Sequence, residues 1–249
     1  MAESLSVEKH GEVTVVRVRP IDRLISVDLE ETGKLWEVLH DFRVSKGRAL
    51  LWLAEAGHMS PESMDRLWER ARETAATKGY VKSTGRIPEI ARVRANIEKL
   101  LSHLVSLRAP VVFAFAGVVD LDLLGLPLAC HYRVCSADTT FLNRVVDIGV
   151  TPGSALAWFL PRFIGAGRAE EILLGGRSLT AKEALDLGLV SAVVSPNEVE
   201  AEGLRIAEQM ASRPREAVES LLRSTRFWDR ELASFIKNVG VGFDRLPER

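Results

Sequence analysis

Short apolar runs alternate with stretches of helical spacing along nearly the whole chain. The runs predict strands at 5–8, 13–19, 49–53, 111–117, 132–135 and 189–194. Between them, apolar residues recur at the spacing of one helical face, which predicts helices at 29–42, 60–77, 87–107, 155–163, 167–174, 199–211 and 215–239. This alternation favours an α/β fold with parallel strands, and no Gly-, Ser- or Pro-rich linker divides it.

Capping signals sharpen several helix ends. Thr180 and Ser195 each have a glutamate three residues later, which predicts capping boxes at both positions. Gly188 is expected to end the helix that follows Thr180. Ser60 with Pro61 predicts another helix start. Pro161 is expected to interrupt the helix at 155–163.

The segment 109–153 has the most suggestive order of elements. A strand ends in Gly117, a loop is expected at 118–122, and an apolar helix is expected from 123 to 130. A strand that runs through a loop into a helix presents backbone N–H groups at the helix N-terminus. Such groups stabilise an anion or a developing oxyanion.

Composition excludes some classes of function. The 249 residues are 47% hydrophobic and 27% charged, which is typical of a globular protein. The net charge of −1 predicts neither nucleic acid nor an anionic membrane as a partner. No apolar run approaches the ~18 residues of a membrane span, and the first residues lack a signal-peptide pattern, so we expect a cytoplasmic protein. Cys130 and Cys135 favour neither a disulfide framework nor a metal site.

A series of motifs, in order, resembles the crotonase (enoyl-CoA hydratase/isomerase) superfamily over roughly residues 4–235. They are Ala109–Val112 with Gly117, Leu128–Arg133, Ile148–Gly153, Gly165–Gly176 and Ala181–Val190, which are similar to the family's K-P-V-I-A-A-V-N-G, L-A-C-D-I-R, L-G-I-I-P-G, G-x-x-R-A-x-E-L-x-L-T-G and A-x-E-A-x-x-x-G-L-V.

The resemblance implies an α/β fold, a crotonase-like ββα spiral over 1–195. A C-terminal helical region would follow at 196–249, and it looks truncated relative to the family. It also implies an acyl-CoA or acyl-carrier thioester as substrate, with no separate cofactor, whose thioester oxygen lies between two backbone N–H groups. Homotrimers or hexamers are the implied assemblies, with a mixed oligomer as an alternative.

The loop after Gly117 departs from the family pattern. Leu121, Asp122 and Leu123 stand where the family has three glycines, and the middle position normally supplies an oxyanion N–H. Every residue keeps its N–H, but Leu-Asp-Leu restricts the backbone more than glycine does. Asp122 is therefore either a new catalytic acid or base, or the N-cap of the helix expected to start at Leu123.

The resemblance also places the two family glutamates on Gly125 and Val145. Hydration of an enoyl thioester needs one group to activate water and another to protonate the α-carbon, and these side chains can do neither. Two-glutamate hydration is therefore not expected. Asp147 is the nearest carboxylate substitute, with a solvated loop residue as the alternative.

The family's first oxyanion segment, A-G-A-D, is missing from the corresponding stretch Gly57–Asp65. The best alignment puts Ser63 or Met64 at the N–H donor position. His58 is a candidate acid or base near the ligand entrance, and a surface histidine is the alternative.

Two functions remain open. One is an acyl-thioester lyase, isomerase, decarboxylase or hydrolase that acts through an enolate without two-glutamate hydration. The other is a non-catalytic crotonase-fold subunit for binding or assembly. A near-zero net charge argues against RNA binding.

Overall fold

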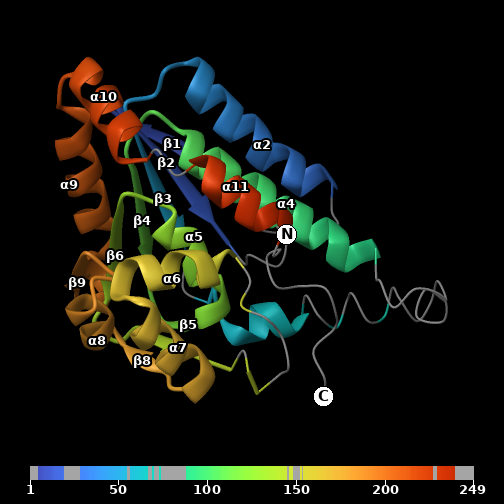
Figure 1. The fold of residues 1–249 in the computed structure, drawn as a ribbon. Helices are drawn as coiled ribbons and strands as arrows, with labels where there is room; N and C mark the ends of the chain where they lie inside the picture. Colours follow the sequence, from blue (N-terminus) through green and yellow to red (C-terminus); the bar gives the residue numbers. More distant parts are fainter. Residues whose placement is uncertain are drawn as a thin grey trace.

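A six-stranded, mostly parallel sheet forms the centre of the protein (Figure 1). The computed structural model describes residues 5–19, 29–54, 57–66, 69, 73, 88–144, 146–147, 152, 154–226 and 229–238. The strands, in spatial order, are β1 (Leu5–His10), β2 (Val13–Val18), β3 (Ala49–Ala54), β4 (Val111–Phe115), β6 (Tyr132–Ser136) and β9 (Ala192–Val194). Within this sheet, as described, β1 and β2 pair antiparallel and the other neighbouring strands pair in parallel, so the predicted parallel α/β arrangement is confirmed.

Helices cover both faces of this sheet. α2 (Leu29–Val44), α4 (Pro88–Ser106) and α11 (Asp229–Asn238) lie on one face, and α9 (Val199–Ala211) lies on the other (Figure 1). Successive strand residues point to opposite faces, so Trp52 joins the first core and Leu51 joins the core under α9. Gly203 allows α9 to approach closely, because a Cβ there would lie only 2.9 Å from Leu51 Cδ1.

A second, three-stranded sheet carries the segment singled out by the sequence. It consists of β5 (Val118–Asp120), β7 (Thr140–Leu142) and β8 (Leu179–Thr180). The prediction of a loop at 118–122 is therefore wrong for Val118–Asp120, which form β5 and pair in parallel with β7. Buried Val119 lies opposite buried Phe141, and this contact between distant residues stabilises a strand that the local sequence does not predict.

Short helices follow β5 and surround the small sheet. They are the 3-10 helix η2 (Leu121–Leu124), α5 (Gly125–Leu128), α6 (Leu156–Ile164), α7 (Ala166–Gly175) and α8 (Ala181–Asp186). The capping box at Thr180 is confirmed, and Gly188 follows α8 with φ 72°. Pro161 does not interrupt α6, in which Leu160 and Phe159 are buried.

The last helical stretch is broken, which corrects the single helix predicted from 215 to 239. The capping box at Ser195 is confirmed and opens η3 (Pro196–Glu198), followed by α9. α10 (Arg215–Thr225) is then capped by Arg226, whose Nη2 donates to the Ala129 carbonyl oxygen at 2.8 Å. The proposed division into a core over 1–195 and a helical region over 196–249 stays a prediction. Within the described ranges, no helix is both long and apolar enough to cross a membrane.

Candidate active site

The two segments expected to form an oxyanion site lie side by side. The Asp120 N–H at the end of β5 donates to the Met59 carbonyl oxygen at 2.7 Å. This bond joins the stretch 57–66, which follows β3, to the stretch that follows β4. The structure thus brings Ser63 and Met64 into the same region as Asp122.

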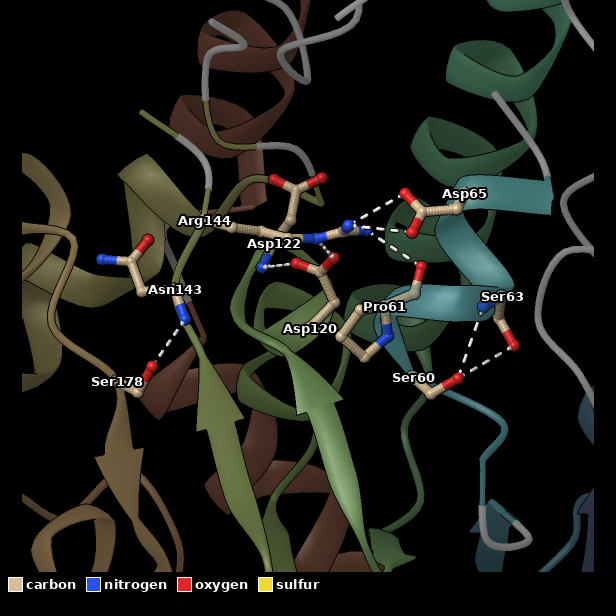
Figure 2. A network of polar contacts seen from close by, with 9 residues as sticks. All are labelled: Ser60, Pro61, Ser63, Asp65, Asp120, Asp122, Asn143, Arg144 and Ser178. Carbon is tan, nitrogen blue, oxygen red and sulfur yellow. Dashed lines mark hydrogen bonds and ion pairs between the residues drawn. The ribbon is translucent and has the colours of Figure 1, made fainter. Parts of the chain in front are cut away.

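Asp120 caps the helix that follows β5. Its extended backbone precedes η2, and its Oδ1 accepts a hydrogen bond from the Asp122 N–H at 3.1 Å. The prediction that Asp122 is the N-cap is therefore wrong by two residues, because the helix begins at Leu121. Asp122 lies inside η2, is 4% exposed, and points its carboxylate away from that of Asp120 (Figure 2).

Arg144 ties this helix start to the neighbouring segment (Figure 2). Its Nε donates to Asp120 Oδ2 at 2.9 Å, and its Nη1 lies 2.9 Å from Asp65 Oδ1. Its Nη2 donates to the Pro61 carbonyl oxygen, also at 2.9 Å. The Arg144 guanidinium, which lies two residues after β7, therefore joins the cap of η2 to the helical residues 61–66.

Burial governs the protonation of this network. The Asp120 side chain is 3% exposed, and desolvation raises its pKa although Arg144 and the Asp122 N–H oppose the shift. Burial lowers the pKa of Arg144, but Asp120 and Asp65 outweigh that effect and raise it overall. Arg144 thus stays charged, and Asp120 holds a proton to higher pH than an ordinary aspartate.

The predicted donors Ser63 and Met64 are already engaged within their own helical turn. The Ser63 N–H donates to Ser60 Oγ at 3.3 Å and to its carbonyl oxygen at 3.0 Å. The Met64 N–H donates to the same carbonyl oxygen at 3.3 Å. Ser60 is thus the predicted N-cap, and the helix start uses the N–H groups that an oxyanion would need.

Gly117 has a backbone role at the end of β4. Its φ of 81° lies in the left-handed region, which glycine adopts without a steric penalty. The residue turns the chain from β4 into β5, and its carbonyl oxygen accepts from the Thr140 N–H at 3.3 Å.

His58 and Asp147 lie outside the network of Figure 2. His58 is 1% exposed and its Nδ1 lies 2.7 Å from the Arg19 carbonyl oxygen, so the surface alternative is wrong for this histidine. Asp147 is exposed in a turn beside Gly176, at the end of α7. Among the residues of known placement, no cluster of three or more His, Cys, Asp or Glu side chains could hold a metal ion.

Gly125 stands where the family's first glutamate falls, and a side chain does not fit there. A Cβ on Gly125 would lie 1.8 Å from the Ser154 carbonyl oxygen and 3.0 Å from the Leu156 N. Both are backbone atoms at the start of α6, so a glutamate would require α5 and α6 to separate. Val145, at the second glutamate position, and most of the motif 148–153 lie outside the described residues.

Sequence reasoning missed Asp120 and Arg144 as site residues. The capping signal was present, since an aspartate two residues before Asp122 can also cap the helix. Arg144 carried no such signal, because its pairing with Asp120 across 24 positions depends on the register of β5 against β7.

Solved structures share this fold. The enoyl-CoA hydratase/isomerase from Pseudoalteromonas atlantica T6c superposes with a TM-score of 0.72 at 24% identity, covering 96% of this chain and 90% of that chain. The enoyl-CoA hydratase from Bacillus halodurans gives a TM-score of 0.77 at 16% identity, covering 96% and 93%. At these identities the likeness establishes the crotonase fold.

Sequence relatives match a shorter stretch. The peroxisomal bifunctional enzyme of Cavia porcellus is 37% identical over 107 residues, and that of Pongo abelii is 36% identical over 108 residues. Each match spans 43% of this chain but only 15% of the relative's length. The family described as enoyl-CoA hydratase/isomerase matches residues 82–228, which is more than half of the chain. The chain therefore belongs to the enoyl-CoA hydratase/isomerase family.

Proposed function

We propose that this chain binds a CoA-type acyl thioester at the start of η2 and moves a proton on it through an enolate. The observation that carries this proposal is the buried Asp122 N–H, which already holds a carboxylate oxygen at 3.1 Å. A donor that accommodates one anionic oxygen has the position and direction to hold another. An enolate oxygen would take the place of Asp120 Oδ1 at this donor.

Asp120 is the group best suited to carry the proton. Its pKa is raised by burial, and it lies directly beside the proposed oxyanion donor. Isomerisation needs one carboxylate, which takes a proton from one carbon of the acyl chain and returns it to another. Decarboxylation needs one proton donor, whereas hydration needs the two glutamates that are absent at Gly125 and Val145. Asp122 is the second candidate proton carrier, ahead of His58 and Asp147.

Hydrogen exchange of butyryl-CoA in D2O tests this proposal, because an enolate forms and is reprotonated without any net reaction. Mass spectrometry should detect deuterium at the α-carbon, and calorimetry should show that butyryl-CoA binds more tightly than CoA. Asp120→Asn should slow exchange by about 100-fold or more. Asp65→Asn is the matched control, since Asp65 contacts the same Arg144 from a side chain that is 55% exposed.

Two results would contradict this proposal. Rapid hydration of crotonyl-CoA would show that the chain catalyses the ordinary family reaction. Binding of butyryl-CoA without α-exchange would show that no enolate forms. If Asp122→Asn rather than Asp120→Asn abolishes exchange, the proton carrier is the other carboxylate.

A non-catalytic binding or assembly subunit is the second candidate function. It is favoured by the engagement of all three candidate donors, Ser63, Met64 and Asp122, in hydrogen bonds within the chain. In this case, a binding subunit should bind butyryl-CoA in calorimetry without α-exchange, whereas an assembly subunit should not bind it. Trimeric or mixed assembly, expected from the family resemblance, is measured in the same samples by sedimentation.

A further inference from the structure

Two adjoining pockets lie at the end of the main sheet opposite the candidate active site. They share Met210, Arg213 and Val218 in their walls. The other lining residues come from the starts of β3, β4 and β6 and from α10 (Figure 1). They belong to neither oxyanion segment, so this region can be considered separately from the thioester site.

The first pocket is apolar and has a volume of about 250 Å³. Pro110 and Met210 form part of its wall, and α10 contributes Val218, Leu221 and Leu222. Leu222 is the buried residue of α10, whereas Leu221 is 61% exposed. The helix thus presents an apolar side to a pocket that the described chain leaves open.

His131 lines this pocket as a neutral ring. Its Nδ1 accepts a hydrogen bond from the Val111 N–H at 2.9 Å. Burial lowers the pKa of His131 to about 3, and the nearby charges of Arg226 and Arg133 act in the same direction. The histidine therefore adds no positive charge at neutral pH, and the cationic residues that line the two pockets are arginines.

The second pocket is lined by four arginines and by no carboxylate: Arg48, Arg108, Arg213 and Arg215. Arg48 donates to the Ala211 carbonyl oxygen, a neutral acceptor that leaves its charge uncompensated. Arg215 has a carboxylate partner, since its Nη1 lies 3.7 Å from Glu219 Oε1. Within the described part of the chain, the exposed Arg213 guanidinium has no acidic partner.

We propose that these adjoining pockets bind an amphiphilic anion with a single acyl chain, of the class of a medium-chain fatty carboxylate. Its alkyl chain would occupy the apolar pocket, and its carboxylate would lie against Arg213. Charge complementarity supports this occupant, because a planar guanidinium pairs well with a carboxylate. The shared wall at Met210, Arg213 and Val218 places the cationic site directly beside the apolar one.

Calorimetry with hexanoate, octanoate and decanoate tests the proposal, with 1-octanol as the uncharged match for octanoate. Affinity should rise about fourfold for each added methylene until the pocket is filled. Octanoate should bind more tightly than 1-octanol. A flat series, or equal binding of octanoate and 1-octanol, would overturn the assignment.

Variants separate the two halves of the site. Arg213→Met should weaken octanoate binding by about tenfold and leave 1-octanol unchanged, since it removes the charge and keeps an apolar stem. Leu221→Asp should weaken both ligands. Arg223→Met is the matched control, because Arg223 is on the same helix but lines neither pocket, and it should leave binding unchanged.

Circular dichroism checks that each variant is folded, and sedimentation checks its oligomeric state. Equal losses of octanoate affinity in Arg213→Met and Arg223→Met would mean that net charge alone causes the effect, which would contradict the proposed site. If the natural chain sediments as a larger species than Leu221→Asp and binds no octanoate, this surface is an interface between copies of the chain, and the proposal is also overturned.

Discussion

Arginines lie at both ends of the main sheet, but their surroundings differ. At the end that carries η2, Arg144 is held by Asp120, by Asp65 and by the Pro61 carbonyl oxygen. At the other end, Arg48 donates to backbone carbonyls and Arg213 has no acidic partner among the described residues. Charge is thus compensated inside the chain at the first end, whereas the second can accept an anion from outside. The same residue type organises a buried segment in one place and forms a cationic surface in the other.

The largest effect should follow from Arg144→Met. This variant leaves the buried Asp120 carboxylate without its cation, and breaking a buried ion pair in this way costs about 3 kcal/mol or more. Urea denaturation at pH 7 should show that loss in the free energy of unfolding. The double variant Asp120→Asn with Arg144→Met should recover most of it, because no buried charge then remains. A loss below about 1 kcal/mol would mean that the two ends of the sheet do not differ as described.

Gly125→Ala should be nearly as costly. The added Cβ would meet the Ser154 carbonyl oxygen at 1.8 Å, so α5 and α6 must shift, and overpacking of this kind costs about 1–3 kcal/mol. Chemical denaturation measures the change.

Gly167→Ala is the matched control, since nothing lies within 4 Å of a Cβ at this helical position. It should be neutral or stabilise the chain by up to about 1 kcal/mol. If both variants behave alike, the close approach at Gly125 is not what excludes a glutamate.

The fold was largely predictable from local patterns. The alternation of apolar runs with helical spacing predicted the parallel sheet, and the capping boxes at Thr180 and Ser195 were visible as short motifs. The errors fall where distant contacts decide the structure. β5 forms because Val119 meets Phe141, and α10 ends where Arg226 reaches the Ala129 carbonyl oxygen.

The candidate site was less predictable for the same reason. The resemblance directed attention to Asp122 and to the Ser63–Met64 stretch, and the structure brings these segments together through the bond between Asp120 and Met59. The resemblance did not indicate that Ser60 engages the N–H groups of Ser63 and Met64, although the local capping signal at Ser60 predicts acceptance from N–H groups of the first turn. Nor did it reveal Arg144, whose partners come from two segments distant in sequence.

The pH dependence of stability should reveal Asp120. Its folded-state pKa is raised, so between the unfolded value near ~3.9 and the folded value the native chain keeps a proton that the unfolded chain has lost. The resulting stabilisation is complete below the unfolded pKa and is lost as pH rises through the folded pKa. Asn cannot titrate, so the unfolding free energy of the natural chain relative to Asp120→Asn should fall with rising pH.

This slope cannot exceed about 1.4 kcal/mol per pH unit, the value for one proton. Urea denaturation of both proteins at a series of pH values above 4 measures it. A difference that rises with pH over this range would show that Arg144 outweighs burial and lowers the pKa of Asp120.

The smallest effect on stability should come from Arg213→Met, the counterpart of Arg144→Met at the other end of the sheet. The Arg213 side chain is exposed and has no acidic partner in the described ranges, so its loss should change the unfolding free energy by less than about 0.5 kcal/mol. The same urea denaturation measures it beside Arg144→Met. A cost close to that of Arg144→Met would mean that Arg213 is compensated within the chain, and the contrast between the ends would fail. A negligible change in the unfolding free energy of Arg213→Met together with weakened octanoate binding would separate the two roles: Arg144 stabilises the fold, and Arg213 binds an anion.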